Sequence, residues 1–312
     1  MAVAVPQPVA PPAQQSRKAP AARRDKFFAW FWIGPAVVFV GVLLFYPVLD
    51  TIGLSLFNFD SSKFVGLQNF HLIFTNPLLL QVLRNNLLWL VVATGGTVLL
   101  GLIIAVLVDR VRIESFAKAT IFIPMALSMT AAAVIWRFVY AYAAPGEKQI
   151  GLLNAIWTAF GGQPQAWTAD PKSVLLNNLL LIVTYVWMWT GFCMVILSAA
   201  LKSIPTEILE AARTDGASEL SIFFRITVPM ISPTIAVVAT TMLINVLKIF
   251  DIVYVMTGGN FGTNVINNEY WNQLFNFNQF GVASALAVIL LIAVIPVMLF
   301  NIRRFRIQEA QR

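Results

Sequence analysis

The sequence predicts an all-α, polytopic membrane protein that crosses the bilayer six times. Of the 312 residues, 59% are hydrophobic and 11% are charged, about half the charged share of a typical soluble domain. The apolar residues lie in runs of roughly twenty or more, the length a helix needs to cross a bilayer core. Inside lipid every backbone amide must be bonded within the protein, so these runs are predicted to be helices.

Six transmembrane segments are expected, and they form a membrane domain at 27–304. The segments run from Phe27 to Phe45, Val82 to Val108, Phe116 to Ala141, Val174 to Leu201, Pro229 to Tyr254 and Val282 to Ile302. A tail at 1–26, rich in Ala, Pro and Gln, has too few apolar residues to fold and is expected to be disordered. A second short tail follows at 305–312, and the segment at about 202–228 lies outside the membrane.

The distribution of basic residues predicts the orientation of the chain. An even number of crossings places both termini on one side, and most Lys and Arg residues lie in the loops of that side. By the positive-inside rule, the termini and the segment between the fourth and fifth spans are cytoplasmic. The net charge of +7 therefore reflects topology, and no nucleic-acid partner is expected.

Composition also argues against an enzyme. The chain has one histidine, His71, and one cysteine, Cys193, which leaves no metal-binding cluster and no disulfide. It lacks the phosphate-binding pattern G-x-x-x-x-G-K-[ST]. The chain is therefore expected to bind no cofactor and no nucleotide itself, and Cys193 is interpreted as a packing residue.

The polar segment between the fourth and fifth spans predicts two short helices separated by a sharp turn. Thr206 is expected to cap a helix over Glu207 to Thr214, and Gly216 to end it in a left-handed conformation. Ser218 is expected to cap the second helix, and Pro229 to open the fifth span.

The first of these helices is predicted to dock onto a cytosolic partner. Glu207 and Glu210 place acidic groups beside the small side chains of Ala211 and Ala212, which let another surface approach closely. A helix lying on the membrane surface is the alternative, but it would carry Lys and Arg along its polar face. A helix inserted into a partner's groove fits the composition better.

The same segment resembles a motif of a known family. The matching residues are Glu210-Ala211-Ala212, Gly216 after three residues, Ile226 after nine more, and Val228-Pro229 after one more. They resemble the EAA motif of ABC-importer permeases, E-A-A-x3-G-x9-I-x-L-P, with Val228 in place of Leu. The resemblance implies the type I ABC importer permease fold and a coupling helix that inserts into a cleft of the ATP-hydrolysing subunit. The implied ATPase-coupling residues are Glu207, Glu210, Ala211, Ala212, Asp215, Gly216, Ile226 and Pro229.

Other stretches resemble the carbohydrate branch of that family. These are 64–70, 201–205, and Asp251 with Thr257-Gly258-Gly259; the last hundred residues resemble permeases for α-glucosides such as trehalose, sucrose and maltose. The resemblance implies a sugar importer in the plasma (inner) membrane of a prokaryote. Its implied partners are a second permease chain of similar fold, an ABC ATPase dimer that holds ATP and Mg, and an extracytoplasmic solute-binding protein.

Polar and aromatic residues inside the fourth and fifth spans are candidates for a sugar cavity. Thr241, Asn245 and Lys248 share one helical face, and polar groups inside spans normally face a protein interior or a wet cavity. In the fourth span, aromatic residues recur at helical spacing, and core packing or lipid contact is the alternative interpretation for them. Pattern and resemblance together give the cavity residues Tyr185, Met188, Trp189, Phe192, Thr241, Ile244, Asn245 and Lys248.

Two further interpretations stay open at this point. Asp251 follows Lys248 by three residues, which favours an ion pair that fixes the helix. An ion-coupled secondary transporter is the alternative function, although the predicted spans hold few carboxylates for a proton relay.

Overall fold

A computed structural model describes residues 23–109 and 111–310. This part of the chain is helical, and its only β-type pairing is an isolated bridge between Phe57 and Phe64. Residues up to Asp50 form one compact unit and residues from Thr51 onward form a second, so each is described by itself.

The first unit contains the first predicted span. Helix α1 (Arg23–Val40) continues through a π-helical turn, η1 (Gly41–Phe45), into α2 (Tyr46–Leu54). The stretch Phe31–Leu54 is long and apolar enough to cross a membrane, so this span ends later than the predicted Phe45. The predicted tail lies mostly outside the described residues, although α1 already begins at Arg23, within that range.

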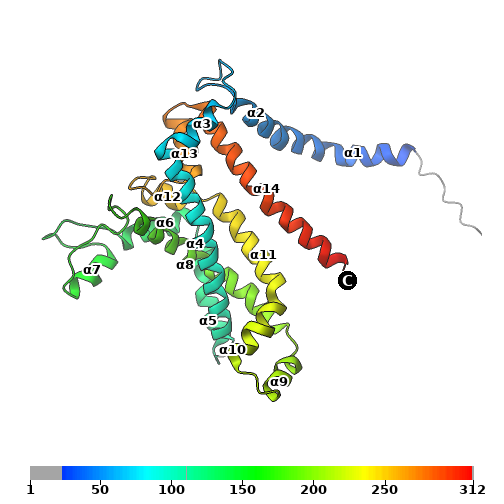
Figure 1. Cartoon of the computed structure of the whole chain (residues 1–312), viewed down its shortest axis with the longest axis vertical. Helices are drawn as coiled ribbons and strands as arrows, with labels where there is room; N and C mark the ends of the chain where they lie inside the picture. Colours follow the sequence, from blue (N-terminus) through cyan, green and yellow to red (C-terminus); the bar gives the residue numbers. More distant parts are fainter. Residues whose placement is uncertain (1–22, 110, 311–312) are drawn as a thin grey trace, which may run out of the picture. The chain divides into compact units, whose positions relative to one another are not determined.

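The second unit carries the rest of the chain. Its elements are α3 (Gln68–Thr75), α4 (Pro77–Val108), α5 (Glu114–Phe122), η2 (Ile123–Ala126), α6 (Met129–Val139), α7 (Leu152–Ala159), α8 (Val174–Lys202), α9 (Thr206–Thr214), α10 (Glu219–Ile222), η3 (Phe223–Thr227), α11 (Val228–Leu247), α12 (Asp251–Met256), α13 (Ile266–Trp271), η4 (Asn272–Asn276) and α14 (Phe280–Ala310). In Figure 1, α9 and α10 lie at one end of this unit and α3 and α13 at the other.

The number of spans agrees with the prediction when one broken helix is counted. Five helices in the described chain are long and apolar enough to cross a membrane, and a sixth span results if a bent pair counts as one. The four unbroken spans of the second unit are Pro77–Val108, Val174–Lys202, Glu219–Leu247 and Phe280–Leu299. The C-terminal tail predicted at 305–312 is helical as far as Ala310, because α14 continues without a break.

The third span is bent, whereas the sequence predicts one continuous helix from Phe116 to Ala141. The segment Glu114–Ala126 and α6 meet at 98°. Pro124 lies in the 3-10 turn η2 and has no N–H to continue an α-helix. Ser128 then starts α6 afresh, since its side chain accepts a hydrogen bond from the Ala131 N–H at 3.1 Å.

The fifth span also differs from the predicted Pro229–Tyr254. It ends at Leu247, and a break at 248–250 separates it from α12. At its other end, Pro229 lies in the first turn of α11 as predicted, but α10, η3 and α11 form one helix, Glu219–Leu247. The π-helical turn η3 precedes Pro229 and accommodates a residue that cannot donate to the preceding turn.

Three apolar clusters hold the second unit together. The first joins α4, α6, α8, α11 and α12 around Trp89 and Tyr185. The second joins α4, α8 and α11 nearer the α9 end, and it buries Cys193, which confirms the packing role predicted for that residue. The third joins α3, α4, α13 and α14 around Leu286.

Helices α4 and α8 approach each other closely at Gly101. A Cβ atom added there would lie 2.5 Å from the Cβ atom of Cys193 and 3.1 Å from the Met194 amide nitrogen. Small residues allow such backbone approach in membranes, where association depends on packing. The α4–α8 contact therefore requires glycine at this position.

Gly101→Ala should destabilise the protein by about 1–3 kcal/mol, the usual cost of overpacking a filled core. Gly95→Ala is the matched control, because Gly95 lies on the same helix and a Cβ added there meets no atom within 4 Å. Thermal unfolding in detergent measures both variants, and equal melting temperatures would contradict the close approach.

Candidate functional site

The hairpin of α9 and α10 projects from one end of the second unit (Figure 1). None of the nine residues of α9 is buried. The helix begins at Thr206 itself, with Pro205 in the N-cap position and no capping side chain, so the predicted Thr206 cap is wrong. Since Thr206 is already helical, its hydroxyl does not occupy the N-cap position, from which a side chain bonds the first free amides.

The turn after α9 is a fully bonded helix stop, as the sequence predicts. Gly216 has φ +82°, a conformation that glycine adopts readily and other residues rarely do. Its N–H donates to the Arg213 carbonyl at 3.0 Å, and the Ala217 N–H donates to the Ala212 carbonyl at 3.0 Å, which is the Schellman pattern. Ser218 then caps α10, because its Oγ accepts from the Ser221 N–H at 3.3 Å.

Two contacts hold the hairpin in place. Leu209 of α9 packs against the second apolar cluster, beside the buried Ile204. Arg213 Nε and Glu219 Oε1 form an ion pair of 2.8 Å that joins α9 to α10, and the Glu219 carboxylate raises the pKa of Arg213. The pair is half exposed to solvent, so it orients the hairpin more than it stabilises the fold.

The remaining residues of the motif leave a small, acidic surface open to a partner. Glu207, Glu210, Ala211 and Asp215 are exposed, and Ala212 is half-buried. Further along, Ile226 lies half-buried in η3 and Pro229 is exposed. The hairpin is thus an exposed projection, and no residue of α9 is buried against the rest of the described chain.

The structure divides the predicted cavity residues of α8 into two groups. Tyr185 is fully buried, packs edge-to-face on Trp89 at 6.2 Å between ring centroids, and directs its hydroxyl toward the Met242 Sδ atom at 4.0 Å. Met188 is also buried. Tyr185 and Met188 are therefore core-packing residues in the single chain, because neither side chain is accessible.

Trp189 and Phe192 remain half-buried on the same helix. Their rings pack edge-to-face at 5.9 Å, and Trp189 also leans on Tyr185 at 6.2 Å. The Trp189 Nε1–H has no hydrogen-bond partner within the described chain. An unbonded indole N–H is costly inside a membrane protein, and because this nitrogen is buried it reaches no external ligand in this arrangement.

On α11 the candidate residues follow the predicted helical face as far as Asn245. Thr241, Ile244 and Asn245 are half-buried. The Thr241 hydroxyl donates to its own helix, at the Val237 carbonyl, 2.9 Å away. No hydrogen bond of the Asn245 side chain is present in the described chain, which leaves its amide free for an external ligand.

The ion pair expected between Lys248 and Asp251 is absent from the described residues. Lys248 is the exposed C-cap of α11, and Phe250 has φ −144°, so the helical spacing that would align the two side chains is broken. Asp251 instead accepts a hydrogen bond from the Thr130 hydroxyl at 2.9 Å, which joins α12 to α6.

Sequence reasoning missed a cluster of asparagines at the start of α4 and α8. The Asn85 Nδ2 atom donates to the Gly262 and Asn264 carbonyls, both at 2.7 Å. Asn177 and Asn178 bond the Phe261 and Gly262 carbonyls from the other helix. The signal was present in the sequence, since an Asn-Asn pair opens each of these otherwise apolar spans.

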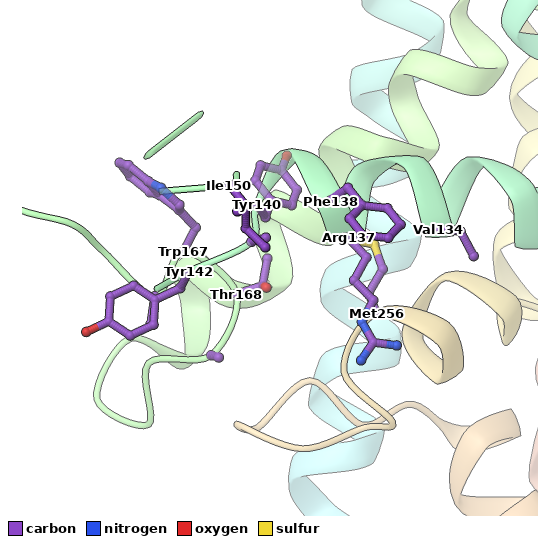
Figure 2. Close-up of a pocket in the computed structure, with 12 residues that line it drawn as sticks. Val134, Arg137, Phe138, Tyr140, Tyr142, Ile150, Trp167, Thr168 and Met256 are labelled. Atoms are coloured by element: carbon purple, nitrogen blue, oxygen red, sulfur yellow. The ribbon is translucent and has the colours of Figure 1, made fainter. Parts of the chain in front are cut away.

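A pocket of about 430 Å³ lies between α6, the segment after α7 and Met256 at the end of α12. Figure 2 shows the rings of Tyr142 and Trp167 on one side of it and Arg137 with Met256 on the other. The Arg137 Nη1 atom donates to the Val255 carbonyl at 3.3 Å, and the Trp167 Nε1 atom donates to the Asn154 Oδ1 atom at 2.9 Å. Both donors are therefore already bonded within the protein, and the pocket presents mainly aromatic and apolar surface.

The helices long enough to span a membrane define a multi-pass membrane protein, and its α9–α10 hairpin is exposed. Residues 97–308 match the family described as "binding-protein-dependent transport system inner membrane component". Because this match covers most of the chain, the protein belongs to that family.

Curated relatives extend over nearly the whole chain. The osmoprotective compounds uptake permease protein GgtC of Synechocystis is 55% identical over 90% of this chain and 100% of its own length. The alpha-glucoside transport system permease protein AglF of Rhizobium meliloti is 47% identical over 88% of this chain and 81% of its own length. These relatives are permeases, so the chain is a permease subunit and not in itself an enzyme.

The fold has a counterpart among solved structures. A chain of a bacterial ABC transporter that imports the acidic polysaccharide alginate superposes with a TM-score of 0.74, at 20% identity, over 91% of this chain and 97% of that chain. At this level of identity the similarity concerns the fold alone, and it confirms the predicted permease architecture.

Gly216→Val should abolish transport, because a β-branched residue at positive φ costs about 1–2 kcal/mol and displaces the hairpin. Gly161→Val is a matched control: Gly161 ends α7 in the same Schellman pattern, with φ +83°, and a Cβ at either glycine meets no atom within 4 Å. Uptake per assembled complex, normalised to protein abundance, measures the effect. Wild-type uptake with Gly216→Val would show that the turn has no role in transport.

Proposed function

We propose that this chain forms half of the translocation channel of an ATP-driven, binding-protein-dependent sugar importer, and that α9 transmits the motion of the ATPase. The observation that carries the proposal is the exposed EAA hairpin. Its small and acidic residues face outward, while Leu209 fastens it to the packed spans. A force applied to α9 therefore reaches the helices that surround the solute pathway.

The α9 end of the chain is proposed to be cytoplasmic. The predicted excess of Lys and Arg on that side supports this orientation. Both termini then lie in the cytoplasm of a prokaryote, and the loop of 257–265 and the pocket beside Arg137 face outward. The proposed extracytoplasmic solute-binding protein would deliver sugar to that outer face.

Two further kinds of partner complete the proposed importer. An ABC ATPase dimer would hold ATP and Mg and receive α9 in a cleft, for which the exposed Ala211 permits close approach. A second permease chain of similar fold would close the channel along the half-buried face of Trp189 and Asn245. Large exposed apolar side chains along the spans are compatible with both lipid and such a partner.

The proposed substrate is an α-glucoside or another oligosaccharide. The relative AglF is named for alpha-glucoside transport, and a trehalose/maltose permease of Thermococcus litoralis is 29% identical over 91% of this chain. In this chain, Trp189 offers a half-buried apolar ring, and Asn245 offers a free amide. These are the groups that bind the C–H faces and hydroxyls of a sugar.

An ion-coupled secondary transporter is the rival function. It would need carboxylates inside the spans for a relay, whereas Asp251 lies at the start of α12 and is bonded to Thr130. Membership of a binding-protein-dependent family also argues against it. Uptake that continues after ATP depletion and collapses with the ion gradient would favour the rival.

Ala211→Cys should crosslink to the ATPase subunit when the importer is purified through this chain, labelled at the new thiol with benzophenone maleimide and illuminated. The residue is exposed on α9, and the native Cys193 is buried and so does not react. Ala159→Cys, on the exposed surface of α7, is the control and should give no such product. Crosslinking of Ala211→Cys to lipid only would contradict the coupling role.

Asn245→Leu should lower sugar translocation at least tenfold, about 1.4 kcal/mol in transition-state terms, and leave association with the ATPase intact. The change removes a polar side chain of similar size without filling new space. Asn276→Leu, an exposed asparagine in η4, provides the control. Loss of assembly with Asn245→Leu would support a packing role instead.

A further inference from the structure

A compact group of ionic side chains lies where α8 leads into α9, and neither the EAA motif nor the cavity includes it. The Lys118 Nζ atom lies 2.7 Å from Asp109 Oδ1 and 2.6 Å from Glu114 Oε1. The Ser198 Oγ atom donates to Asp109 Oδ1 at 2.6 Å, and Lys202 pairs with Glu114. The negative charges of two carboxylates and the positive charges of two ammonium groups thus balance within this group.

The group joins the ends of three helices, of which only α4 and α5 are neighbours in the sequence. Asp109 caps the end of α4, Glu114 and Lys118 form the first turn of α5, and Ser198 and Lys202 lie one turn apart at the end of α8. Lys118 also bonds Ser198, so its ammonium group contacts α4 and α8 as well as its own helix. One side chain therefore holds all three helix ends together.

These pairs differ from ordinary surface ion pairs. The side chains of Asp109 and Lys118 are 16% and 19% exposed, and only Lys202 is more than half exposed. Partial burial reduces screening by salt, and several shared partners restrict the geometry more than one isolated pair does. Such an arrangement resists relative movement of the three helix ends.

Its position next to the coupling hairpin gives the group a mechanical consequence. Lys202 is the last residue of α8, and α9 begins at Thr206 after the buried Ile204. A displacement of α9 would first move the end of α8. The ion pairs of Glu114 and Lys118 would then pass this movement to α5. The next helix, α6, is hydrogen-bonded to α12 through Thr130 and Asp251.

We propose that Asp109, Glu114, Lys118, Ser198 and Lys202 form an ionic clamp that makes α4, α5 and α8 move as one body with the coupling hairpin. The inference rests on the proposed coupling function of α9 and assigns positioning residues to it. Lys118 is the central member, because it alone contacts both carboxylates and the Ser198 hydroxyl.

Lys118→Met tests the clamp, because it removes the charge and keeps an aliphatic stem. The importer is purified with its partner subunits, reconstituted in proteoliposomes, and supplied with whichever of maltose, sucrose and trehalose the wild type imports fastest. We expect the number of ATP molecules hydrolysed per sugar imported to rise about threefold or more, in line with coupling energies between residues in contact. Lys118→Arg keeps the charge and should restore the wild-type ratio.

Arg112→Met is the matched control. Arg112 lies between α4 and α5, is exposed and forms no ion pair in the described chain, so its loss should leave the ratio unchanged. If Lys118→Met does not assemble, Ser198→Ala removes the hydroxyl that links α8 to Asp109 and Lys118 but keeps the ion pairs, and a smaller rise in the same ratio is expected.

A group that only stabilises the fold would lower the amount of complex and leave ATP per sugar at the wild-type value in Lys118→Met and Ser198→Ala. That outcome overturns the clamp. Failure of the proposed function has a different signature, since Ala211→Cys would then give no crosslink from α9 to an ATPase and the wild-type protein would show no ATP-dependent uptake. The two failures are therefore distinguishable.

Discussion

The packing of α4 against α8 is the contact on which the second unit depends. Gly101 allows the two backbones to approach, and the apolar clusters on either side of that crossing receive α6, α11 and α12. In a membrane, lipid competes with every apolar contact, so shape complementarity between helices replaces the hydrophobic effect as the source of specificity. The crossing therefore positions both the loop that follows α12 and the hairpin at the opposite end.

Breaks in two of the spans bring α6 and α12 into contact. The 98° bend after Pro124 directs α6 toward α12, and the break at Lys248 lets α12 meet it through Asp251 and Thr130. Backbone groups freed by such breaks need partners inside a membrane. Asparagines at the start of α4 and α8 provide them for the loop that follows α12.

The shape of the hairpin depends on local interactions, and its attachment depends on long-range ones. Its stop at Gly216 and its cap at Ser218 are local and were predicted from residue type alone. Its attachment through Leu209, and the ionic group around Lys118 behind it, bring together residues from distant parts of the chain. A projection that is rigid within itself and firmly attached can transmit movement, whereas a flexible loop would absorb it.

The sequence by itself determined the helical class, the number of crossings and the position of the EAA hairpin, because hydrophobic run length and turn residues act locally. Tertiary structure alone decided which candidate side chains are accessible. Tyr185 and Trp189 share one helical face in the sequence, yet Trp89 buries the first and leaves the second half-open. It also separated Lys248 from Asp251 and brought Lys118 to Asp109, since neither a helix break nor a contact between helices is encoded in the spacing of residues along one helix.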